Sequence, residues 1–461
     1  MGDLIRMSRW SHHFERHEMT AFFHSVSLGL AFIPKEAGRF LVKILKEPKT
    51  RHEVENAVGS DVVNFLLQEG ILVQGDDVAD RACLDELRQK LLGDITVELL
   101  YLLVTDHCNL RCRYCFEDAP VRIEPFRPTH MTVEIAERAI DLFARMTSRY
   151  GNPEKKKVVH LYGGEPLVNQ KVVRFAVEHV RALKDKNILP STCEAAIVTN
   201  GTFLDDSLAK FFAENGVTVG ISVDGPREIN NLYRQSKDGR LDVFESTMRA
   251  LEYLRKHHAK VGLSVTLTPE VVWHFDRVLD FLVGQMGWVD GVSLNILHFN
   301  PSMSLSTDYY VEATKCQIAA FERFRQIGMY EDRVMRKAKA FVTRQPLYAD
   351  CGVVGSQLVV APDGQIGVCQ DFVKPRTYFH GSVMDQNIDP VADGLFEQWR
   401  KRSPLFMETC ADCPALGICG GGCPASAELK TGNRWNLDER ACAHSKLILE
   451  WMIWDTYAQI S

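Results

Sequence analysis

Short apolar runs alternate with amphipathic segments through the middle of the chain. Six apolar runs have the pattern of buried strands. They span residues 96–105, 157–162, 194–199, 217–223, 260–266 and 291–296. Between and after them, apolar residues recur with helical spacing over 133–149, 171–184, 205–215, 242–257, 272–286 and 307–327. Because strands that alternate with helices are typical of βα units around a parallel sheet, residues 93–328 are predicted to form one α/β domain.

The first 92 residues have a different pattern. Alternation of Val26, Leu28, Leu30 and Phe32 with small residues predicts a strand, which would form a hairpin with residues 20–24. Three helical patterns follow over 35–46, 51–58 and 61–69, with Ser60 as the expected N-cap of the third. A short strand over 71–73 and a connecting helix over 81–93 complete this part. The order of elements predicts a winged-helix module over residues 1–92.

Charge and composition narrow the possible partners. The chain has 461 residues, of which 46% are hydrophobic and 25% charged, which is ordinary for a globular protein. Its formal charge is −6, and residues 35–70 carry six basic and six acidic side chains, a poor electrostatic footprint for DNA. No apolar run has the length of a membrane span or of a secretory core. We therefore expect a cytoplasmic protein without a nucleic-acid or membrane partner.

Cysteines are frequent, and most of them are grouped. Of 13 cysteines, ten fall into two clusters, at 108–115 and 351–442. In a long chain without a secretion signal, grouped cysteines are more often metal ligands than disulfides. Cys83, Cys193 and Cys316 stand apart and are interpreted as small apolar residues.

The first cluster is a Cx3Cx2C motif made by Cys108, Cys112 and Cys115. It directly follows the predicted strand 96–105, at the position where α/β barrels carry their chemistry. Thiolates hold iron–sulfur clusters, and three of them leave one iron of a [4Fe–4S] cluster without a protein ligand. Three unrelated buried cysteines, or half of a zinc site, are the alternatives.

This motif, with Tyr114 directly before its last cysteine, resembles the signature of the radical S-adenosylmethionine (SAM) enzymes. The resemblance implies that SAM binds the open iron, and that its reductive cleavage yields a 5′-deoxyadenosyl radical that abstracts a hydrogen atom. It also implies a partial (β/α)6 TIM-like barrel over residues 93–328. An electron donor such as flavodoxin or ferredoxin would be required.

The motif Gly163-Gly164-Glu165-Pro166 follows the second predicted strand and resembles the GGEP motif of the same family. There the resemblance implies that the backbone and Glu165 bind the amino group of SAM. Glycines allow a close backbone approach, and a carboxylate suits an ammonium group. A tight Gly-Gly turn is the alternative.

Later strand ends carry further pocket candidates. Asn200 follows the third strand, and Ser222 and Asp224 end the fourth. All three resemble family positions that line the SAM pocket, the last two near the ribose; ordinary turn residues are the alternative. Arg234 resembles an arginine that peptide- and protein-modifying relatives place near the SAM carboxylate, which a guanidinium suits. A solvated surface charge is the alternative at that position.

The second cluster contains seven cysteines in a fixed order. They are Cys351, Cys369, Cys410, Cys413, Cys419, Cys423 and Cys442. Their spacing resembles the SPASM domain, which binds two auxiliary [4Fe–4S] clusters and would bring the total to three. Residues 329–461 are therefore expected to be a bridging region and a SPASM domain; a pair of zinc sites is the alternative.

The resemblance assigns Cys410, Cys413, Cys419 and Cys442 to the distal auxiliary cluster, and Cys351, Cys369 and Cys423 to the cluster nearer the active site. The nearer cluster lacks an evident fourth cysteine. Cys316, Asp350 or another group would supply that ligand, or one iron would be open. Our hypothesis at this stage is an open iron that binds a substrate thiolate.

Taken together, the motifs resemble peptide-modifying radical SAM/SPASM enzymes. In many such enzymes an N-terminal winged-helix module binds the leader of a ribosomally made precursor peptide as an added strand. A packing or dimerisation domain, or a nucleic-acid-binding module, is the alternative for residues 1–92. We expect a thioether or C–C cross-link as the product. Sulfatase maturation to formylglycine is the enzyme alternative, disfavoured by the 107 residues ahead of Cys108. A non-catalytic iron–sulfur scaffold or peptide-binding adaptor is the alternative of another class. No residue is identified as a general base.

Overall fold

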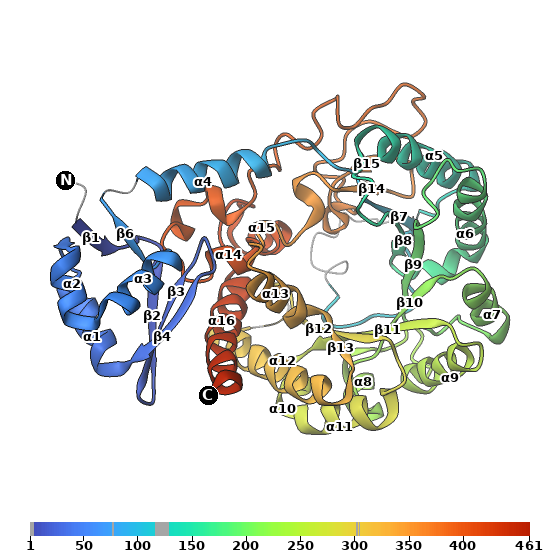
Figure 1. Ribbon diagram of the computed structural model, residues 1–461. Helices are drawn as coiled ribbons and strands as arrows, with labels where there is room; N and C mark the ends of the chain where they lie inside the picture. Colours follow the sequence, from blue (N-terminus) through green and yellow to red (C-terminus); the bar gives the residue numbers. More distant parts are fainter. Residues whose placement is uncertain (1–3, 76–77, 116–128, 301–302, 304) are drawn as a thin grey trace.

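The computed structural model describes residues 4–75, 78–115, 129–300, 303 and 305–461 (Figure 1). Its centre is a nine-stranded sheet in the order β13-β12-β11-β10-β9-β8-β7-β14-β15. The strands are β7 (Leu99–Thr105), β8 (Val158–Gly163), β9 (Glu194–Thr199), β10 (Thr218–Ser222), β11 (Lys260–Leu267), β12 (Gly291–Ile296), β13 (Tyr330–Glu331), β14 (Gln357–Val360) and β15 (Ile366–Gly367). All neighbours are parallel except the pair β14–β15. The six predicted strands are present, and the parallel α/β sheet is confirmed.

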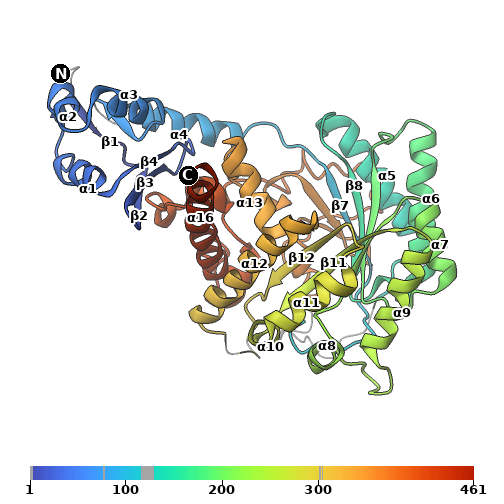
Figure 2. The ribbon, with the colours of Figure 1, turned by 60° about the horizontal axis from the view of Figure 1, so that its bottom comes forward.

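Helices cover the outer face of this curved sheet, as Figures 1 and 2 show. They are α5 (Val133–Tyr150), α6 (Gln170–Asp185), α7 (Asp206–Glu214), α9 (Val243–Lys256), α11 (Phe275–Met286) and α12 (Thr307–Ile327), with the short α8 (Arg227–Tyr233) and α10 (Pro269–Trp273). Each turns an apolar stripe inward, such as the fully buried Ala139, Ile140 and Phe143 of α5. No helix of the described residues is long and apolar enough to cross a membrane.

One predicted helix is wrong in its extent. The segment 272–286 contains the end of α10 and all of α11, and the two helices are separated at His274. The start of α10 is fixed by the Thr268 side chain, which accepts a hydrogen bond from the N–H of Val271, and by Pro269 at the first helical position. Helical periodicity alone does not report such a break.

The N-terminal part consists of two small sheets and four helices. Its elements are β1 (Leu4–Met7), β2 (Ser11–Arg16), β3 (Met19–His24), β4 (Leu30–Pro34), α1 (Lys35–Ile44), β5 (Lys49–Thr50), α2 (Arg51–Val58), α3 (Ser60–Gln68), β6 (Leu72–Gln74) and α4 (Val78–Leu91). The sheets have the antiparallel orders β2-β3-β4 and β5-β1-β6. The hairpin, the three helices and the last strand were predicted, whereas β1 and β2 were missed because their residues are largely polar or half-exposed.

Two local predictions in this part are wrong. The strand begins at Leu30 and not at Val26, because Leu28 has a φ of 60° and the chain reverses there. Ser60 is the first residue of α3 and not its cap; Gly59, with a φ of 92° that suits glycine, precedes the helix.

The N-terminal part packs against the C-terminal end of the chain. Phe23 of β3 stacks on Phe341 with 5.8 Å between ring centroids, and Phe32 of β4 lies 5.1 Å from Tyr457. Arg344 adds an ion pair with Glu69 at 2.9 Å. Figure 1 accordingly shows the last helix, α16 (Glu439–Ile460), between the N-terminal sheet and the barrel.

The C-terminal region is joined to the barrel through the central sheet. Besides β13, β14 and β15 it contains α13 (Asp332–Thr343), α14 (Leu416–Cys419), α15 (Pro424–Thr431) and α16. Strand β14 pairs in parallel with β7, with Gln357 opposite Leu99 and Val360 opposite Leu102. The sheet therefore extends beyond the six predicted strands on both sides.

Candidate active site and iron–sulfur sites

The Cx3Cx2C loop lies at the carboxyl end of β7, as expected for a barrel active site. The segment that follows α8 holds it from one side. Arg111 donates its N–H to the carbonyl of Gln235 at 2.7 Å, and Arg113 does so to Tyr233 at 3.1 Å. The N–H of Cys115 donates a hydrogen bond to the carbonyl of Cys112 at 3.0 Å. The backbone of the cysteine loop is thus fixed by protein contacts.

The two glycines at the end of β8 press against this loop. A Cβ at Gly163, where φ is 139°, would lie 2.1 Å from the carbonyl oxygen of Thr105. A Cβ at Gly164 would lie 2.6 Å from the carbonyl group of His107 and 3.0 Å from the nitrogen of Cys108. Backbones approach this closely only where no side chain intervenes. The glycines of the GGEP motif are therefore needed to seat the cysteine loop.

Cys108 lies at the centre of the candidate cluster site. Its sulfur accepts a hydrogen bond from the N–H of Leu110 at 3.4 Å and lies 4.0 Å from Nδ2 of Asn200. Burial raises the pKa of its thiol, and the neighbouring charges of Glu165, Cys112 and Cys115 raise it further. Three thiols that interact in a partly buried loop fit the ligand set of a three-thiolate cluster.

Glu165 is buried beneath this loop and is almost fully hydrogen-bonded. Its carboxylate accepts the N–H of Leu167 at 2.9 Å, the hydroxyl of Thr199 at 2.6 Å and the N–H of Asn200 at 2.7 Å. Burial raises its pKa despite these bonds. Since a carboxylate offers about four lone-pair positions, about one remains for a ligand such as an ammonium group.

Tyr114, Asp224 and Arg234 form one buried network. The Asp224 carboxylate accepts the Tyr114 hydroxyl at 2.5 Å, Nε of Arg234 at 2.8 Å and the N–H of Thr266 at 2.9 Å. The guanidinium lies 5.5 Å from the Tyr114 ring centroid. Burial raises the pKa of Tyr114 well above its usual value. The surface-charge alternative for Arg234 is wrong, because the residue is only 7% exposed.

The other two pocket candidates lie at neighbouring strand ends. Nδ2 of Asn200 donates to Oδ1 of Asn109 at 3.0 Å, so it joins the cysteine loop to the end of β9. Ser222 is the last residue of β10, is half-buried, and pairs with Ser264 of β11. The structure thus gathers the sequence-predicted residues at one edge of the sheet.

Four of the C-terminal cysteines come together around the start of α16. Burial raises the pKa of Cys442 to about 12, and the charges of Cys419, Cys410 and Cys413 contribute to the shift. The pKa of Cys410 is raised to about 11 by burial and by two of the same neighbours. Their mutual electrostatic influence indicates that these four thiols lie near one another; whether they hold one cluster stays a prediction.

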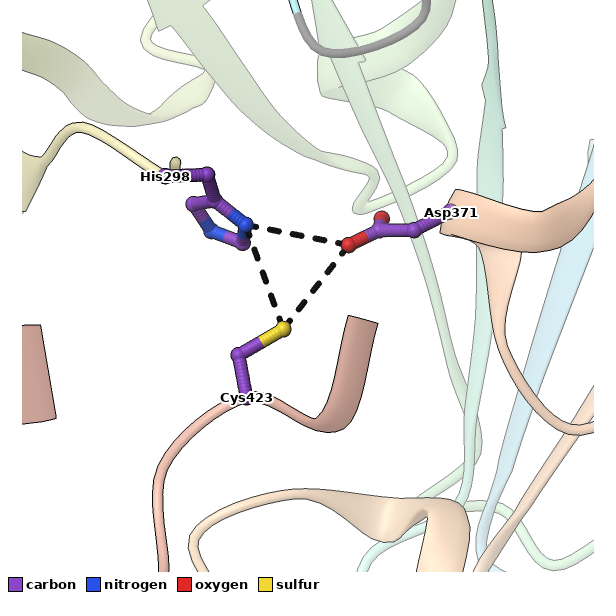
Figure 3. A group of neighbouring side chains, drawn as sticks. All are labelled: His298, Asp371 and Cys423. Atoms are coloured by element: carbon purple, nitrogen blue, oxygen red, sulfur yellow. Dashed lines mark hydrogen bonds and ion pairs between the residues drawn. The ribbon is translucent and has the colours of Figure 1, made fainter. Parts of the chain in front are cut away.

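The remaining three C-terminal cysteines form a second group. Burial raises the pKa of Cys369 well above its usual value, and Asp371, Cys423 and Cys351 are the neighbouring charges that raise it. Figure 3 shows Cys423 with Asp371 and His298. The Cys423 sulfur lies 3.9 Å from Oδ2 of Asp371 and 3.9 Å from Nδ1 of His298, and the latter two atoms are 3.8 Å apart.

Of the two named candidates for a fourth ligand, Asp350 acts electrostatically on Cys351 of this group, whereas Cys316 lies in α12 among other charged neighbours. Cys316 is buried in α12, and the charged neighbours that act on its pKa are Glu312 and Asp276. Asp350 is paired with Arg336 at 3.1 Å. Asp371 and His298 were missed, although Asp371 follows Cys369 by only two residues in the sequence.

Two arginines beside the C-terminal cysteines, the buried Arg402 and the half-buried Arg440, were also missed. Arg402 is 2% exposed and donates to the carbonyls of Gly421, Arg434 and Asn436 at 2.6–3.0 Å. Burial lowers its pKa, and nearby cysteines oppose that effect. Arg440 binds Asp438 at 3.0 Å. Both cations interact electrostatically with these cysteines, and only their proximity to the cysteine run could have indicated them.

Aromatic side chains fill the space between the barrel strands and the second cysteine group. Tyr101 and His160 are partners on β7 and β8, with ring centroids 5.0 Å apart, and Tyr162 lies 5.9 Å from Tyr101. Burial raises the pKa of Tyr101 to about 12, with Cys351 the next contributor. In the sequence, polar aromatic residues within otherwise apolar strands were the signal that could have indicated this cluster.

A parallel α/β sheet with a three-cysteine loop after the carboxyl end of β7 is the arrangement expected for a SAM-dependent iron–sulfur enzyme. The model of the radical SAM superfamily matches residues 102–282. A serine-type anaerobic sulfatase-maturating enzyme of Bacteroides thetaiotaomicron is 34% identical over 354 residues, covering 71% of this chain and 82% of that enzyme. The chain therefore belongs to the radical SAM superfamily and is an enzyme of a family that uses SAM and a [4Fe–4S] cluster.

Other relatives match more of the chain at lower identity. The radical SAM cyclopropyl synthase TigE of Paramaledivibacter caminithermalis is 23% identical, covering 94% of this chain and 92% of that protein. The structure of anSMEcpe with bound AdoMet has a TM-score of 0.65 and 22% identity, and covers 79% of this chain and 96% of its own. Streptococcus suis SuiB bound to precursor peptide SuiA has a TM-score of 0.53 and 13% identity, and covers 95% and 99%.

Proposed function

We propose that this enzyme modifies a ribosomally made precursor peptide by installing an intramolecular thioether or C–C cross-link. Cys108, Cys112 and Cys115 would hold the cluster that binds SAM. When bound, SAM and the clusters supply a 5′-deoxyadenosyl radical for hydrogen abstraction and an acceptor for the electron left after bond formation. The protein positions the peptide and excludes water.

The cysteine loop is the observation that carries this proposal. It lies at the carboxyl end of β7, seated on Gly163 and Gly164, with Glu165 and Asn200 directly beneath it. We assign the SAM pocket to Tyr114, Gly163, Gly164, Glu165, Asn200, Ser222, Asp224 and Arg234. Because Arg234 is bound to Asp224, we infer that these two shape the pocket as a pair.

The share of the chain that different relatives match supports a peptide substrate with a leader. TigE and SuiB match 94–95% of this chain, whereas the anSMEcpe structure and the Bacteroides enzyme match 79% and 71%. We infer that residues 1–92 are a winged-helix, leader-recognition module. Strand β2 pairs only with β3 among the described strands, so its other edge is available for an added strand.

The two groups of C-terminal thiols support two auxiliary clusters within a SPASM domain, for a total of three. The cysteines of each group are buried or half-buried, and the buried Arg402 and the half-buried Arg440 lie near them. Both arginines act electrostatically on cysteines of these groups. Cations that offset thiolate charge are what a buried cluster needs.

The first test uses anaerobically reconstituted protein. We expect about 12 iron per chain and reductant-dependent 5′-deoxyadenosine from SAM, three [4Fe–4S] clusters being what these cysteines hold. Cys112→Ala should abolish the nucleoside and lower iron to about 8, whereas the matched Cys193→Ala should change neither. Zinc in place of iron, or equal nucleoside from Cys112→Ala, would overturn the proposal.

Sulfatase maturation is the second candidate, because the Bacteroides relative has the higher identity. The two products differ chemically. A cross-linked peptide loses two hydrogens and carries no aldehyde, whereas formylglycine reacts with hydroxylamine. Co-expression with short peptides encoded beside the gene, followed by mass spectrometry with and without hydroxylamine, separates them. Turnover that is lost on deletion of residues 1–92 would favour the leader-dependent function.

A further inference from the structure

Asp371 is a buried carboxylate without a matching cation. Its side chain is 7% exposed. Among the described residues, the one hydrogen bond to this carboxylate comes from the Cys423 thiol, with 3.9 Å between sulfur and Oδ2. Arg440 acts on it electrostatically but donates its own hydrogen bonds to Asp438 and to the carbonyl of Ile296. A carboxylate buried in this way is costly unless it binds a cation or a metal.

The surroundings of Asp371 identify the missing partner as a metal. Its Oδ2 lies 3.9 Å from the Cys423 sulfur, and it follows Cys369 by two residues, so it lies beside two cysteines of the second group. Its charge also acts on the Cys351 thiol. Three thiolates fill three positions of a four-iron cluster, and a carboxylate oxygen can bind iron at the fourth.

The other candidate ligands are less well placed. Asp350 is bound by Arg336 at 3.1 Å and is 34% exposed, so its charge is already compensated. Cys316 lies within α12 and shows no influence from the three cysteines. His298 lies beside Asp371, with 3.8 Å between Nδ1 and Oδ2, but its ring is 34% exposed (Figure 3).

We propose that the Asp371 carboxylate is the fourth protein ligand of the cluster held by Cys351, Cys369 and Cys423. This inference rests on the auxiliary clusters of the proposed function. It replaces the hypothesis of an open iron, because a protein ligand then occupies the position that a substrate thiolate would take.

The test uses a full-length parent that lacks the SAM-binding cluster through Cys108→Ala, Cys112→Ala and Cys115→Ala. With two auxiliary clusters it should hold about 8 iron. Asp371→Ala should lose about one iron on ferricyanide oxidation and show the electron paramagnetic resonance signal of a three-iron cluster. Asp371→Cys should keep four irons and convert the one oxygen-ligated iron of the Mössbauer spectrum to the all-thiolate type. The matched control Asp350→Ala should do neither.

Each result decides the inference. An unchanged Mössbauer spectrum in Asp371→Cys would overturn it, even if Asp371→Ala fails to fold. Nitrogen coupling to the cluster that disappears in His298→Ala would overturn it in favour of the histidine. About 8 iron with no effect of Asp371 would overturn only this inference, whereas a parent without iron would overturn the auxiliary clusters as well.

Discussion

Two buried aspartates in this enzyme have opposite surroundings. Asp224, at the barrel mouth, accepts hydrogen bonds from Tyr114, Arg234 and Thr266 and has its countercharge 2.8 Å away. Asp371, in the C-terminal region, accepts only from a thiol among the residues described. Both side chains are nearly inaccessible, at 2% and 7% exposed.

The Asp224 carboxylate has its hydrogen-bond donors within the protein, whereas the Asp371 carboxylate has one weak donor and can still accept a ligand. A satisfied network such as that of Asp224 holds its geometry without help and gives the pocket a rigid wall. A carboxylate with one weak donor is costly to bury in its charged form, and burial raises the pKa of Asp371 to about 6. Burial alone therefore does not mark a binding site; the balance of donors does.

The largest effects should come from glycine substitutions that damage either the barrel mouth or the C-terminal cysteine region alone. Gly164→Ala places a Cβ 2.6 Å from the His107 carbonyl group and should displace the cysteine loop, abolishing 5′-deoxyadenosine while about 8 iron remain. Gly420→Ala, whose Cβ would lie 2.5 Å from the Asp350 nitrogen, should instead remove iron from the C-terminal region. Iron counts and nucleoside assays measure both.

Gly284→Ala is the control for these substitutions, because no atom lies within 4 Å of its added Cβ. It should retain about 12 iron and full nucleoside formation. Equal loss of iron in the Gly164→Ala and Gly420→Ala proteins would show that the two regions do not assemble independently.

Asp224→Ala should destabilise the protein by about 3–5 kcal/mol, because it leaves the Arg234 charge buried and unpaired. Asp371→Ala in iron-free protein should leave the free energy of unfolding unchanged or raise it, since it removes an uncompensated charge. Urea unfolding of both variants measures the contrast. A similar loss in both would remove the distinction between the two aspartates.

Glu331 provides an intermediate case with a pH dependence. It is fully buried and accepts the N–H groups of Val334 and Leu294, and burial raises its pKa to about 7. Because the folded pKa exceeds the usual value, its protonated form stabilises the fold at low pH, and this contribution is lost as pH rises through about 7.

Glu331→Gln should remove that dependence. Wild type should lose stability relative to the variant, of the order of 2 kcal/mol, between pH 5 and pH 8. Thermal unfolding across this range measures the difference. Parallel curves for the two proteins would contradict the assignment.

Tyr114→Phe should have the smallest effect. It removes one of the hydrogen bonds to Asp224 and keeps the ring over Arg234, so we expect a loss of about 1 kcal/mol. Tyr150→Phe, at a surface bond to Asp389, is the matched control and should change stability less. An effect as large as that of Asp224→Ala would show that the hydroxyl has a role beyond this network.

The barrel was predictable because its strands and helices carry their own signals. β9 and β12 have the predicted bounds, since each is an apolar run between clear turn residues. β13 and β15 have two residues each, too few for a periodicity, and depend on pairing with β12 and β14. Leu28 was wrongly placed in a strand, because it is apolar and buried but lies in a turn.

The cysteine sites were predictable from spacing, but their surroundings were not. Motifs bring ligands together within one loop, as with Cys108 and Cys112. His298 comes from a segment that only the fold brings near Cys423, whereas Asp371 and Arg402 are close to cysteines in the sequence but carry no motif that marks them. The pairing of Arg234 with Asp224 likewise depends on the path of α8 and could not be read from the sequence.

The pairing of β14 with β7 has a consequence for electron transfer. The Cx3Cx2C loop follows the carboxyl end of β7, and Cys351 and Cys369 flank the adjacent strand pair β14–β15. The two clusters that we propose would both be attached to this hydrogen-bonded sheet. Their separation, and with it the rate of electron transfer between them, would then be set by the fold and not by the position of a bound peptide.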